Sequence, residues 1–515
     1  MKSIDSKNIL LALCSGVLLG LSQPLFMPLI SSLPSTHYWG ALALIGYVPL
    51  FWAIAEQNLK KTFMLTFLAN TVQYTIAFYW IYIALHVYGH IPPLASGLIT
   101  ILVAMLMALL GGFFFVLGRF LSIRCERSFF YYAPFILCAL EYCRNYQPFG
   151  GFPWGNTGYS IARIPELLQL ASLGGIYSLV LLVSLVNAFL CLAIKSKDRK
   201  NRFRWLGSAL VLVLLVAVYG FVRINRGAHE FSPSLRVALL QGNIPQEQKN
   251  QSRLYASDII DIYRDLYRQA IKEEANLVIW PEASYPWVVN RERPDFKLGL
   301  DEYVASVIGS TAYGSNVYHN SAFLIDYHGE VKYRYDKTHL VPFGEYVPKL
   351  LIGLVDKIVP GMGAFKPGNE FKPVELALKL GQNLNIGTTI CYEGIFPEIS
   401  RAYANNGANI LVNLTNDAWY GASSAPYQHL LMYQVRSVET GRVYLRATNS
   451  GVSAWVDVYG QLHKPTGLFE RGLVIDNVPV ITKSTLYLLI GDLIPILCSV
   501  LVALAWLLAL RRKNI

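Results

Sequence analysis

The feature that most constrains this chain is a series of apolar runs, each about long enough to cross a lipid bilayer. About 20 apolar residues in a helix span the roughly 30 Å hydrocarbon core. Eight such runs stand out, and prolines interrupt the first two: residues 8–28, 38–55, 63–85, 93–118, 128–142, 168–194, 205–224 and 485–510. The sequence therefore predicts a polytopic α-helical membrane bundle of about eight transmembrane helices. Seven fall in residues 1–224, and the last falls in a C-terminal segment, 485–515.

Composition supports a membrane part and excludes two broad classes of protein. The chain is 54% hydrophobic and only 15% charged, against about 25% charged residues in an ordinary soluble protein. A wholly soluble enzyme and a disordered chain are therefore both excluded. The first run follows Lys2 and Lys7 but lacks a small-residue cleavage site, so it is expected to stay as an uncleaved helix.

The charges predict how the helices are oriented. One set of helix ends carries sixteen lysines and arginines, whereas the opposite loops at 29–37, 86–92 and 143–167 carry only Arg144 and Arg163. Cytoplasmic loops are enriched in Lys and Arg. Both termini are therefore expected in the cytoplasm, and residues 225–484 on the far side of an inner membrane, in the periplasm. The net charge of +11 fits this asymmetry, and no basic stripe interleaved with aromatics indicates nucleic-acid binding.

Residues 225–484 have the pattern of a folded α/β domain. Short strand-like runs, including a hairpin that pairs 321–326 with 331–336, alternate with helical stretches at 254–275 and 395–406. The other strand-like runs are residues 235–241, 277–281, 385–390, 410–414, 442–448 and 451–458. This alternation indicates a layered α/β domain.

Three segments of this domain carry residues suited to chemistry. Glu282 follows a buried strand that ends at Pro281, the place where α/β folds often bind ligands. Lys337 and Glu345 lie in a segment of mixed charge, where the lysine could hold an oxyanion and the glutamate could orient it. Cys391 ends a strand at a glycine-flanked turn, which suits an exposed nucleophile with Glu282 as its base. Taken singly, each segment also fits a surface glutamate, a surface ion pair or a buried structural cysteine.

Taken together, the three segments resemble the Glu-Lys-Cys pattern of the nitrilase superfamily, in order and in spacing. Residues 241–246 (QGNIPQ) and 413–421 (NLTNDAWYG) also fit it. A nitrilase-like domain between seven membrane helices and a final one resembles the apolipoprotein N-acyltransferase family over nearly the whole chain, including residues 151–154 (GFPW) and 341–346 (VPFGEY). The resemblance implies a nitrilase-like αββα sandwich in residues 225–484.

The resemblance also implies an activity and roles for residues. Glu282 would act as base and Lys337 as oxyanion donor, and Cys391 would carry an acyl chain as a thioester between a phospholipid, typically phosphatidylethanolamine, and a diacylglyceryl apolipoprotein. Lys337 would share the oxyanion with the backbone N–H of Tyr392. Glu345 and Glu393 would support the site, and Tyr392 and Trp419 would form pocket walls.

The sequence contains no motif typical of a metal site. Cys391 is the one cysteine in residues 225–484, and neither a CxxC pair nor an HExxH motif is present, so we expect no metal and no cofactor.

A membrane-anchored amidase remains an alternative, although seven helices exceed what an anchor requires. A transporter with a binding domain is disfavoured, because its spans would carry more polar residues than Glu141 and Asp492. We expect a monomer, with the apolar residues 350–366 touching membrane lipid.

Overall fold

The computed structural model describes residues 4–25, 39–227, 234–347, 365–379 and 383–511. The chain forms two compact units. A helical unit comprises residues 1–229, 423–431 and 489–515, and an α/β unit comprises residues 230–422 and 432–488. The segment 423–431 therefore belongs to the helical unit although it lies inside the α/β part of the sequence.

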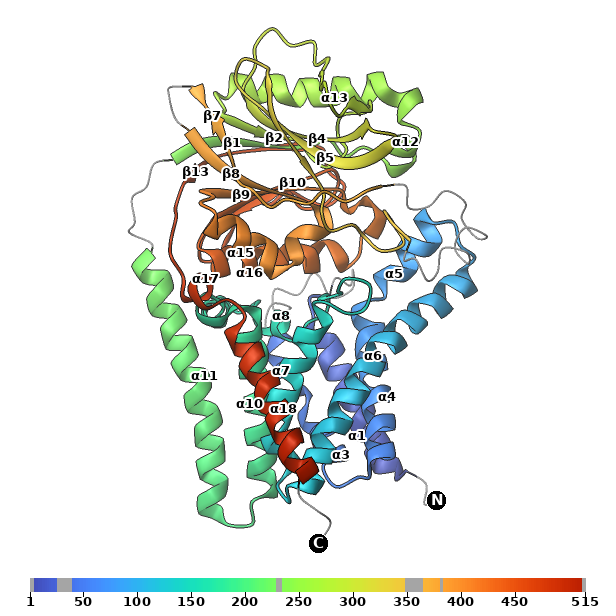
Figure 1. Cartoon of the computed structure of the whole chain (residues 1–515), viewed down its shortest axis with the longest axis vertical. Coiled ribbons are helices and arrows are strands. Elements are labelled where there is room, and N and C mark those ends of the chain that lie inside the picture. The colour runs from blue at the N-terminus through green and yellow to red at the C-terminus, as the bar shows by residue number, and fades with distance from the viewer. Residues whose placement is uncertain (1–3, 26–38, 228–233, 348–364, 380–382, 512–515) are drawn as a thin grey trace. The chain divides into compact units, whose positions relative to one another are not determined.

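The helical unit is built mainly from helices (Figure 1). Its main helices are α1 (Ser6–Ser22), α3 (Val48–Ile54), α4 (Leu59–Ala77), α6 (Pro93–Arg124), α7 (Ala133–Arg144), α10 (Ala171–Lys195), α11 (Arg199–Gly227) and α18 (Leu493–Arg511). Shorter ones are α2 (Ala43–Gly46), α5 (Trp80–Ile83), α8 (Gly158–Ile161), α9 (Pro165–Leu168), the π-helix η2 (Ala84–Tyr88) and the 3-10 helix η3 (Phe129–Tyr131).

Four of these helices, among the described residues, are long and apolar enough to cross a membrane: α6, α10, α11 and α18. The other predicted spans give shorter or more polar helices. Run 8–28 ends as a helix at Ser22, shortly before Pro24, and run 128–142 gives the 12-residue α7. Run 63–85 divides among α4, α5 and η2, and α4 carries buried Asn70 and Gln73. The predicted region of apolar helices is therefore present, whereas the number of eight transmembrane helices stays a prediction.

A glutamine ties segment 423–431 into the helical unit. The Oε1 atom of Gln428 accepts hydrogen bonds from the indole N–H groups of Trp80 at 3.1 Å and Trp154 at 2.6 Å. Its Nε2 atom donates to the carbonyl oxygens of Pro24 at 3.0 Å and Ala77 at 3.1 Å. Because a buried amide is costly when unpaired, these four bonds hold the segment firmly within the helical unit.

The α/β unit contains two mixed β-sheets. The seven-stranded sheet has the order β13-β1-β2-β4-β5-β6, with β3 paired to β4, and the six-stranded sheet has the order β12-β11-β10-β9-β8-β7. The first comprises β1 (Ser234–Gln241), β2 (Leu277–Ile279), β3 (Val289–Asn290), β4 (Ala305–Gly314), β5 (Val317–Ile325), β6 (Val331–Asp336) and β13 (Gly472–Pro479). The second comprises β7 (Val374–Ala377), β8 (Asn383–Ile390), β9 (Ile410–Thr415), β10 (Val443–Thr448), β11 (Ala454–Val456) and β12 (Leu462–His463).

Helices cover the outer faces of the two sheets, which gives the predicted αββα sandwich (Figure 1). The seven-stranded sheet is covered by α13 (Ser252–Lys272), with α12 (Gln246–Asn250) beside it. The six-stranded sheet is covered by α15 (Pro397–Asn405) and by the part of α16 (Ala425–Thr440) from Met432 onward. The short helices η6 (Cys391–Ile395), η7 (Asp417–Tyr420) and α17 (Leu486–Ile490) complete the elements.

The core between α13 and its sheet follows from an amphipathic pattern in the sequence. α13 buries Ile259, Ile260, Tyr263, Tyr267 and Ala270 at helical spacing. They pack in one cluster with the apolar side chains of the sheet, and Tyr263 stacks on Trp280 with ring centroids 5.1 Å apart. This packing fixes the strand β2, and thereby the residues that directly follow it.

Candidate active site

Glu282 lies just beyond the carboxyl end of β2. Pairing continues past the strand, since the Trp280 N–H donates to the Val307 carbonyl at 2.9 Å. Ala283 then takes a positive φ of 44°, which turns the chain sharply. The turn rests on Gly309, where a Cβ would clash with the Pro281 carbonyl oxygen and lie 2.8 Å from the Cα of Glu282. The chain therefore needs glycine at 309 to bring Glu282 to the strand end.

Lys337 directly follows β6 and is surrounded by acidic side chains. Its ammonium Nζ lies 2.9 Å and 2.8 Å from the two carboxylate oxygens of Glu345, and 3.4 Å from Oε1 of Glu282. The Lys337 side chain is 1% exposed. A buried cation is tolerated only where partners compensate for its lost hydration, and these two carboxylates are the partners.

Glu345 is itself held by the loop that carries it. Its Oε2 atom accepts from the N–H of Val341 at 2.9 Å, and its own N–H donates to the Val341 carbonyl at 2.9 Å. The loop thus closes on itself and presents a fixed carboxylate to Lys337.

Asn320 joins the two carboxylates and was not singled out from the sequence. Its Nδ2 donates to Oε1 of Glu282 and to Oε1 of Glu345, both at 2.7 Å. Its carbonyl oxygen accepts from the N–H of Lys337 at 2.8 Å. Asn320 therefore bridges Glu282, Glu345 and the backbone of Lys337, and so fixes the relative positions of these three charged residues.

Cys391 begins η6 at the carboxyl end of β8, on the second sheet. The residue is 6% exposed and has a φ of 51°, a conformation that costs a non-glycine residue about 1–3 kcal/mol. Its carbonyl oxygen accepts from the Tyr433 hydroxyl at 2.6 Å and from Nδ2 of Asn413 at 3.4 Å. These bonds stabilise a strained turn at the expected nucleophile.

Arg446 links the residues that hold this turn. Its guanidinium donates to Oδ1 of Asn413 at 3.0 Å and to Oδ2 of Asp417 at 2.6 Å, and it lies 4.7 Å from the centre of the Tyr433 ring. Arg446 and Asp417 are both 0% exposed at the side chain. Such a buried hydrogen-bonded network rigidifies its surroundings, here the backbone behind Cys391.

Glu393 connects the nucleophile turn to the segment after Lys337. Its Oε1 atom accepts from the Tyr335 hydroxyl, from the N–H and hydroxyl of Thr338 and from the N–H of His339, at 2.6 to 3.1 Å. Its Oε2 atom accepts from the Ile390 N–H at 2.8 Å. Burial raises the pKa of Glu393, while the bonds from Tyr335, Ile390 and Thr338 act in the opposite direction.

The aromatic residues named from the sequence occupy two different environments. Tyr392 is 3% exposed and packs edge-on against Phe396, with ring centroids 5.2 Å apart. Trp419 lies on η7 and is 40% exposed. Their assignment as pocket walls stays a prediction, and most of the apolar segment 350–366 lies outside the described residues.

Burial and nearby charges determine the protonation states of Cys391 and Lys337, and so which of them can act as nucleophile or base. Burial and the nearby Glu282 charge raise the pKa of the Cys391 thiol, although Lys337 acts in the opposite direction. Burial alone would lower the pKa of Lys337, but the charges of Glu345 and Glu282 outweigh it and the net pKa is raised. Cys391 thus rests as a neutral thiol that needs a base, and Lys337 stays a cation and cannot be that base.

His339 does not behave as a base at neutral pH. Burial, and then the charge of Lys337, lower its pKa to about 4. Its ring packs against Phe396 with centroids 3.9 Å apart. The side chain is therefore a neutral packing group.

A metal site is not found among the described residues, where no group of three or more His, Cys, Asp or Glu side chains could hold an ion. The chemistry that the arrangement allows is acyl transfer through a thiol. A thiol, a carboxylate and a fixed cation are the groups that such a reaction requires.

Two family models match the chain. Residues 15–189 match the apolipoprotein N-acyltransferase N-terminal domain, and residues 236–482 match carbon-nitrogen hydrolase. The apolipoprotein N-acyltransferase of Geobacter metallireducens is 35% identical over 100% of this chain and 97% of its own length. The chain belongs to the apolipoprotein N-acyltransferase family.

Other members of the apolipoprotein N-acyltransferase family are also similar. That of Azotobacter vinelandii is 32% identical over 93% of this chain and 90% of its own. Among solved structures, an amidase from Nesterenkonia sp. is 24% identical, covers 48% of this chain and 92% of its own, and has a TM-score of 0.36.

One residue of the candidate site, Asn320, could have been found from the strand register of the predicted hairpin but was missed. The predicted hairpin pairs Ser321 with Asp336, as the structure does, so the next pair outward is Asn320 and Lys337. That register alone points to Asn320. Arg446 and Tyr433 gave no such signal, because an arginine on a strand and a tyrosine on a helix are ordinary in any domain.

Proposed function

We propose that the protein transfers a fatty acyl chain from a phospholipid to the α-amino group of the N-terminal diacylglyceryl-cysteine of an apolipoprotein. The observation that carries this is the buried Lys337 cluster, with Glu282 at 3.4 Å and Glu345 at 2.8 Å, together with the Cys391 thiol, which interacts electrostatically with Glu282 and Lys337. Membership of the family and the apolar helices support the choice of lipid substrates.

In the first half-reaction, Glu282 takes the thiol proton as the sulfur attacks the ester carbonyl carbon at the sn-1 position. The ester oxygen gains negative charge, which Lys337 stabilises together with the backbone N–H of Tyr392. The intermediate collapses, and the Glu282 proton passes to the departing glycerol oxygen. Lysophospholipid leaves and a thioester remains on Cys391. The raised pKa of the thiol supports a proton transfer concerted with attack rather than a preformed thiolate.

In the second half-reaction, the neutral α-amino group attacks the thioester carbonyl. Glu282 takes one proton from the attacking nitrogen, and the sulfur leaves and regains that proton. An amide forms and the free enzyme returns. Each half-reaction moves one proton through Glu282, so the net charge of the cluster stays constant while charge moves between its members.

Glu345 has a supporting role in this scheme. It holds the Lys337 ammonium through both of its oxygens, so the cation is in place before the oxyanion forms. Preorganised charge of this kind is often the largest single contribution to catalysis.

For the membrane, we propose eight helices in an inner membrane, with residues 225–484 between the bundle of 1–224 and the final segment 485–515. The cation asymmetry supports cytoplasmic termini and a periplasmic catalytic domain. Phosphatidylethanolamine as donor and a monomeric state complete the proposal. Topology reporters fused after Asn201 and after Ser232 should report opposite compartments, and the same compartment for both would overturn this orientation.

The enzymatic proposal is tested by trapping the acyl-enzyme. The purified protein, incubated with phosphatidylethanolamine alone, should gain the mass of one acyl chain on Cys391, and neutral hydroxylamine should remove it. Cys391→Ala should abolish both the adduct and transfer to a diacylglyceryl peptide, whereas Cys14→Ala, at an exposed thiol, should change neither. Lys337→Ala should slow adduct formation about a hundredfold or more.

Two outcomes would contradict the proposal. Transfer that persists in Cys391→Ala would exclude the thioester. Release of free fatty acid in place of the lipidated peptide would indicate a hydrolase.

A further inference from the structure

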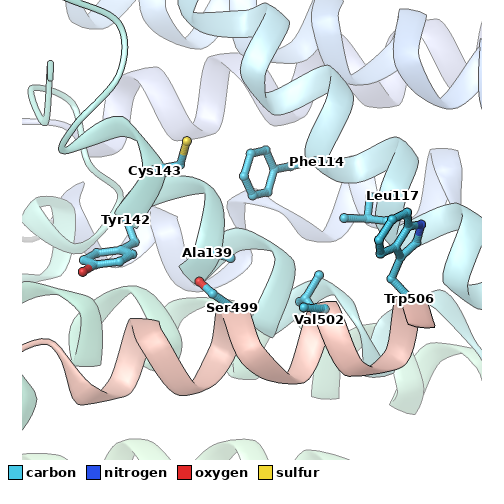
Figure 2. Close-up of a pocket in the computed structure, with 9 residues that line it drawn as sticks. Phe114, Leu117, Ala139, Tyr142, Cys143, Ser499, Val502 and Trp506 are labelled. Carbon is cyan, nitrogen blue, oxygen red and sulfur yellow. The ribbon is translucent and has the colours of Figure 1, made fainter. Parts of the chain in front are cut away.

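The helical unit contains a hollow whose lining residues are not among those of the candidate active site. It has a volume of about 300 Å³ and is bounded by α6, α7 and α18 (Figure 2). On α18, Ser499, Val502, Ala503 and Trp506 line it. These residues are spaced three, four and seven apart, so one face of the helix forms one wall.

Small side chains explain why the helices leave space here. Three of the residues that line the hollow have small side chains, Ala139 on α7 and Ser499 and Ala503 on α18. Larger rings border the space, with Trp506 towards one end of the row and Tyr142 towards the other (Figure 2). From Ser499 to Trp506 the helix rises about 10 Å at 1.5 Å per residue, which is most of the thickness of one leaflet of a roughly 30 Å hydrocarbon core.

The lining favours an apolar occupant. The Ser499 hydroxyl donates to the carbonyl oxygen of Pro495 at 2.8 Å, so it is satisfied within its own helix, as is usual for serine in apolar helices. The other lining residues on α6 and α18 are Phe114, Leu117, Val502, Ala503 and Trp506. An anionic or strongly polar ligand would find no cation among them.

The apolar helices around the hollow indicate that its occupant is a lipid chain. α6 and α18 are two of the helices long and apolar enough to cross a membrane. Outside the hollow they expose large apolar side chains, such as Phe113 at 63%, Leu504 at 51% and Leu508 at 60%. Such surfaces are stable in hydrocarbon rather than in water. An apolar cavity of about 150 Å³ already binds a benzene molecule, so a hollow twice that size can take several methylene groups.

We propose that this hollow is a binding site for one acyl chain of a membrane phospholipid, which fills the space between α6, α7 and α18. The lipid is a resident partner, and it gains dispersion contacts on three sides where an ordinary boundary lipid gains them on one. The site depends on insertion in a bilayer and is independent of the acyl-transfer chemistry proposed above.

Photo-cross-linking tests this site. The full chain is reconstituted in nanodiscs with phosphatidylcholine that carries a diazirine midway along one acyl chain, and the cross-linked residues are mapped by mass spectrometry. Residues of the hollow on α18, Val502 and Trp506, should cross-link at least threefold more than Leu504 and Leu508 on the same helix. Equal yields around the helix would show that only boundary lipid is present and would overturn the proposal.

A space-filling substitution provides the matched comparison. Ala503→Phe should lower cross-linking at Phe114 and Val502 at least threefold, whereas Leu504→Phe, at an exposed position, should leave it unchanged. Ala139→Leu fills the same hollow from α7 and should repeat the effect if Ala503→Phe fails to fold. If both filled variants fold and cross-link like the unaltered protein, no acyl chain occupies the hollow. Acyl transfer by the unaltered protein is measured in parallel, so the two proposals fail separately.

Discussion

The ammonium group of Lys249 donates a hydrogen bond to the backbone carbonyl oxygen of Glu282, with the two atoms 2.9 Å apart. Lys249 comes from α12, far from Glu282 in sequence, and it was not among the residues expected at the site. Burial lowers the pKa of Lys249 to about 8, although the Glu282 charge acts in the opposite direction. The lysine therefore anchors the turn of the expected base and places a positive charge beside it at neutral pH.

Replacing this lysine should shift the pH dependence of the enzyme. Lys249→Met keeps the length of the side chain but removes the charge and the donor. The rate of acyl-Cys391 formation should decline as the pH rises through about 8, where Lys249 loses its proton. Lys249→Met should lack this decline and should be about tenfold slower at neutral pH, whereas Lys249→Arg should stay charged and keep the neutral-pH rate. A decline that persists unchanged in Lys249→Met would show that the lysine acts through packing alone.

Gly309→Ala should damage catalysis by displacing Glu282. The added methyl would meet the backbone of Pro281 and lie 2.8 Å from the Cα of Glu282, and backbone cannot swing away as a side chain can. We expect acyl-Cys391 formation to fall at least a hundredfold, measured by mass in single-turnover samples. Gly472→Ala is the control, because nothing lies within 4 Å of a Cβ there, and its rate should be unchanged. A normal rate in Gly309→Ala would mean that the turn tolerates the shift.

Asn320→Asp should introduce repulsion into the centre of the site. The side-chain donor that bonds Glu282 and Glu345 at 2.7 Å becomes a third carboxylate facing two others. Because like charges in contact repel one another and the bridging donor is lost, we expect acyl-enzyme formation to fall about a hundredfold or more at neutral pH. The exposed Asn406→Asp should behave like the unaltered protein, and a full rate in Asn320→Asp would refute the bridging role.

His339 should make stability depend on pH. Its pKa is about 4 in the folded protein and near 6.5 in an unfolded chain, so between these values the unfolded chain binds more protons. Stability should therefore be fully present above about pH 6.5 and decline as the pH falls towards 4. In His339→Phe, the decrease in melting temperature between pH 7 and pH 5 should be smaller than in the unaltered protein, and the exposed His328→Phe should leave it unchanged. An equal decrease in His339→Phe would contradict the assigned cause.

Much of the α/β unit could be predicted from sequence, because its strands are buried runs punctuated by Pro, Gly and turns. The expected strand at 410–414 is observed as Ile410–Thr415, and the expected helix at 254–275 as Ser252–Lys272. Glu282 and Cys391 could be named because each follows such a strand, and Lys337 because its segment mixes both charges. Local sequence patterns do not identify Lys249 and Arg446 as site residues. Their roles become visible only in the folded structure, where segments distant in sequence lie together.

The helical region was predicted less accurately for a physical reason. A window of apolar residues reports composition and not helix continuity. The run at 63–85 is apolar enough, but α4 ends at Ala77 and the chain continues as the short α5 and a π-helix. Polar residues inside the unit also compensate one another, as Glu141 and Arg144 do at 2.7 Å, and no hydropathy average reveals such a pair.

The four hydrogen bonds of Gln428 limit how modular this protein can be. The sequence invites excision of the hydrolase-like part, about residues 234–482, as a free-standing water-soluble catalyst. Such a fragment would carry segment 423–431 without Trp80, Trp154 and the carbonyls of Pro24 and Ala77, so a buried amide would lose all four of those partners at once. Gene fusion or domain shuffling at the apparent border would meet the same obstacle. Gln428 therefore makes one segment of the hydrolase-like sequence depend on partners that only the helical unit supplies.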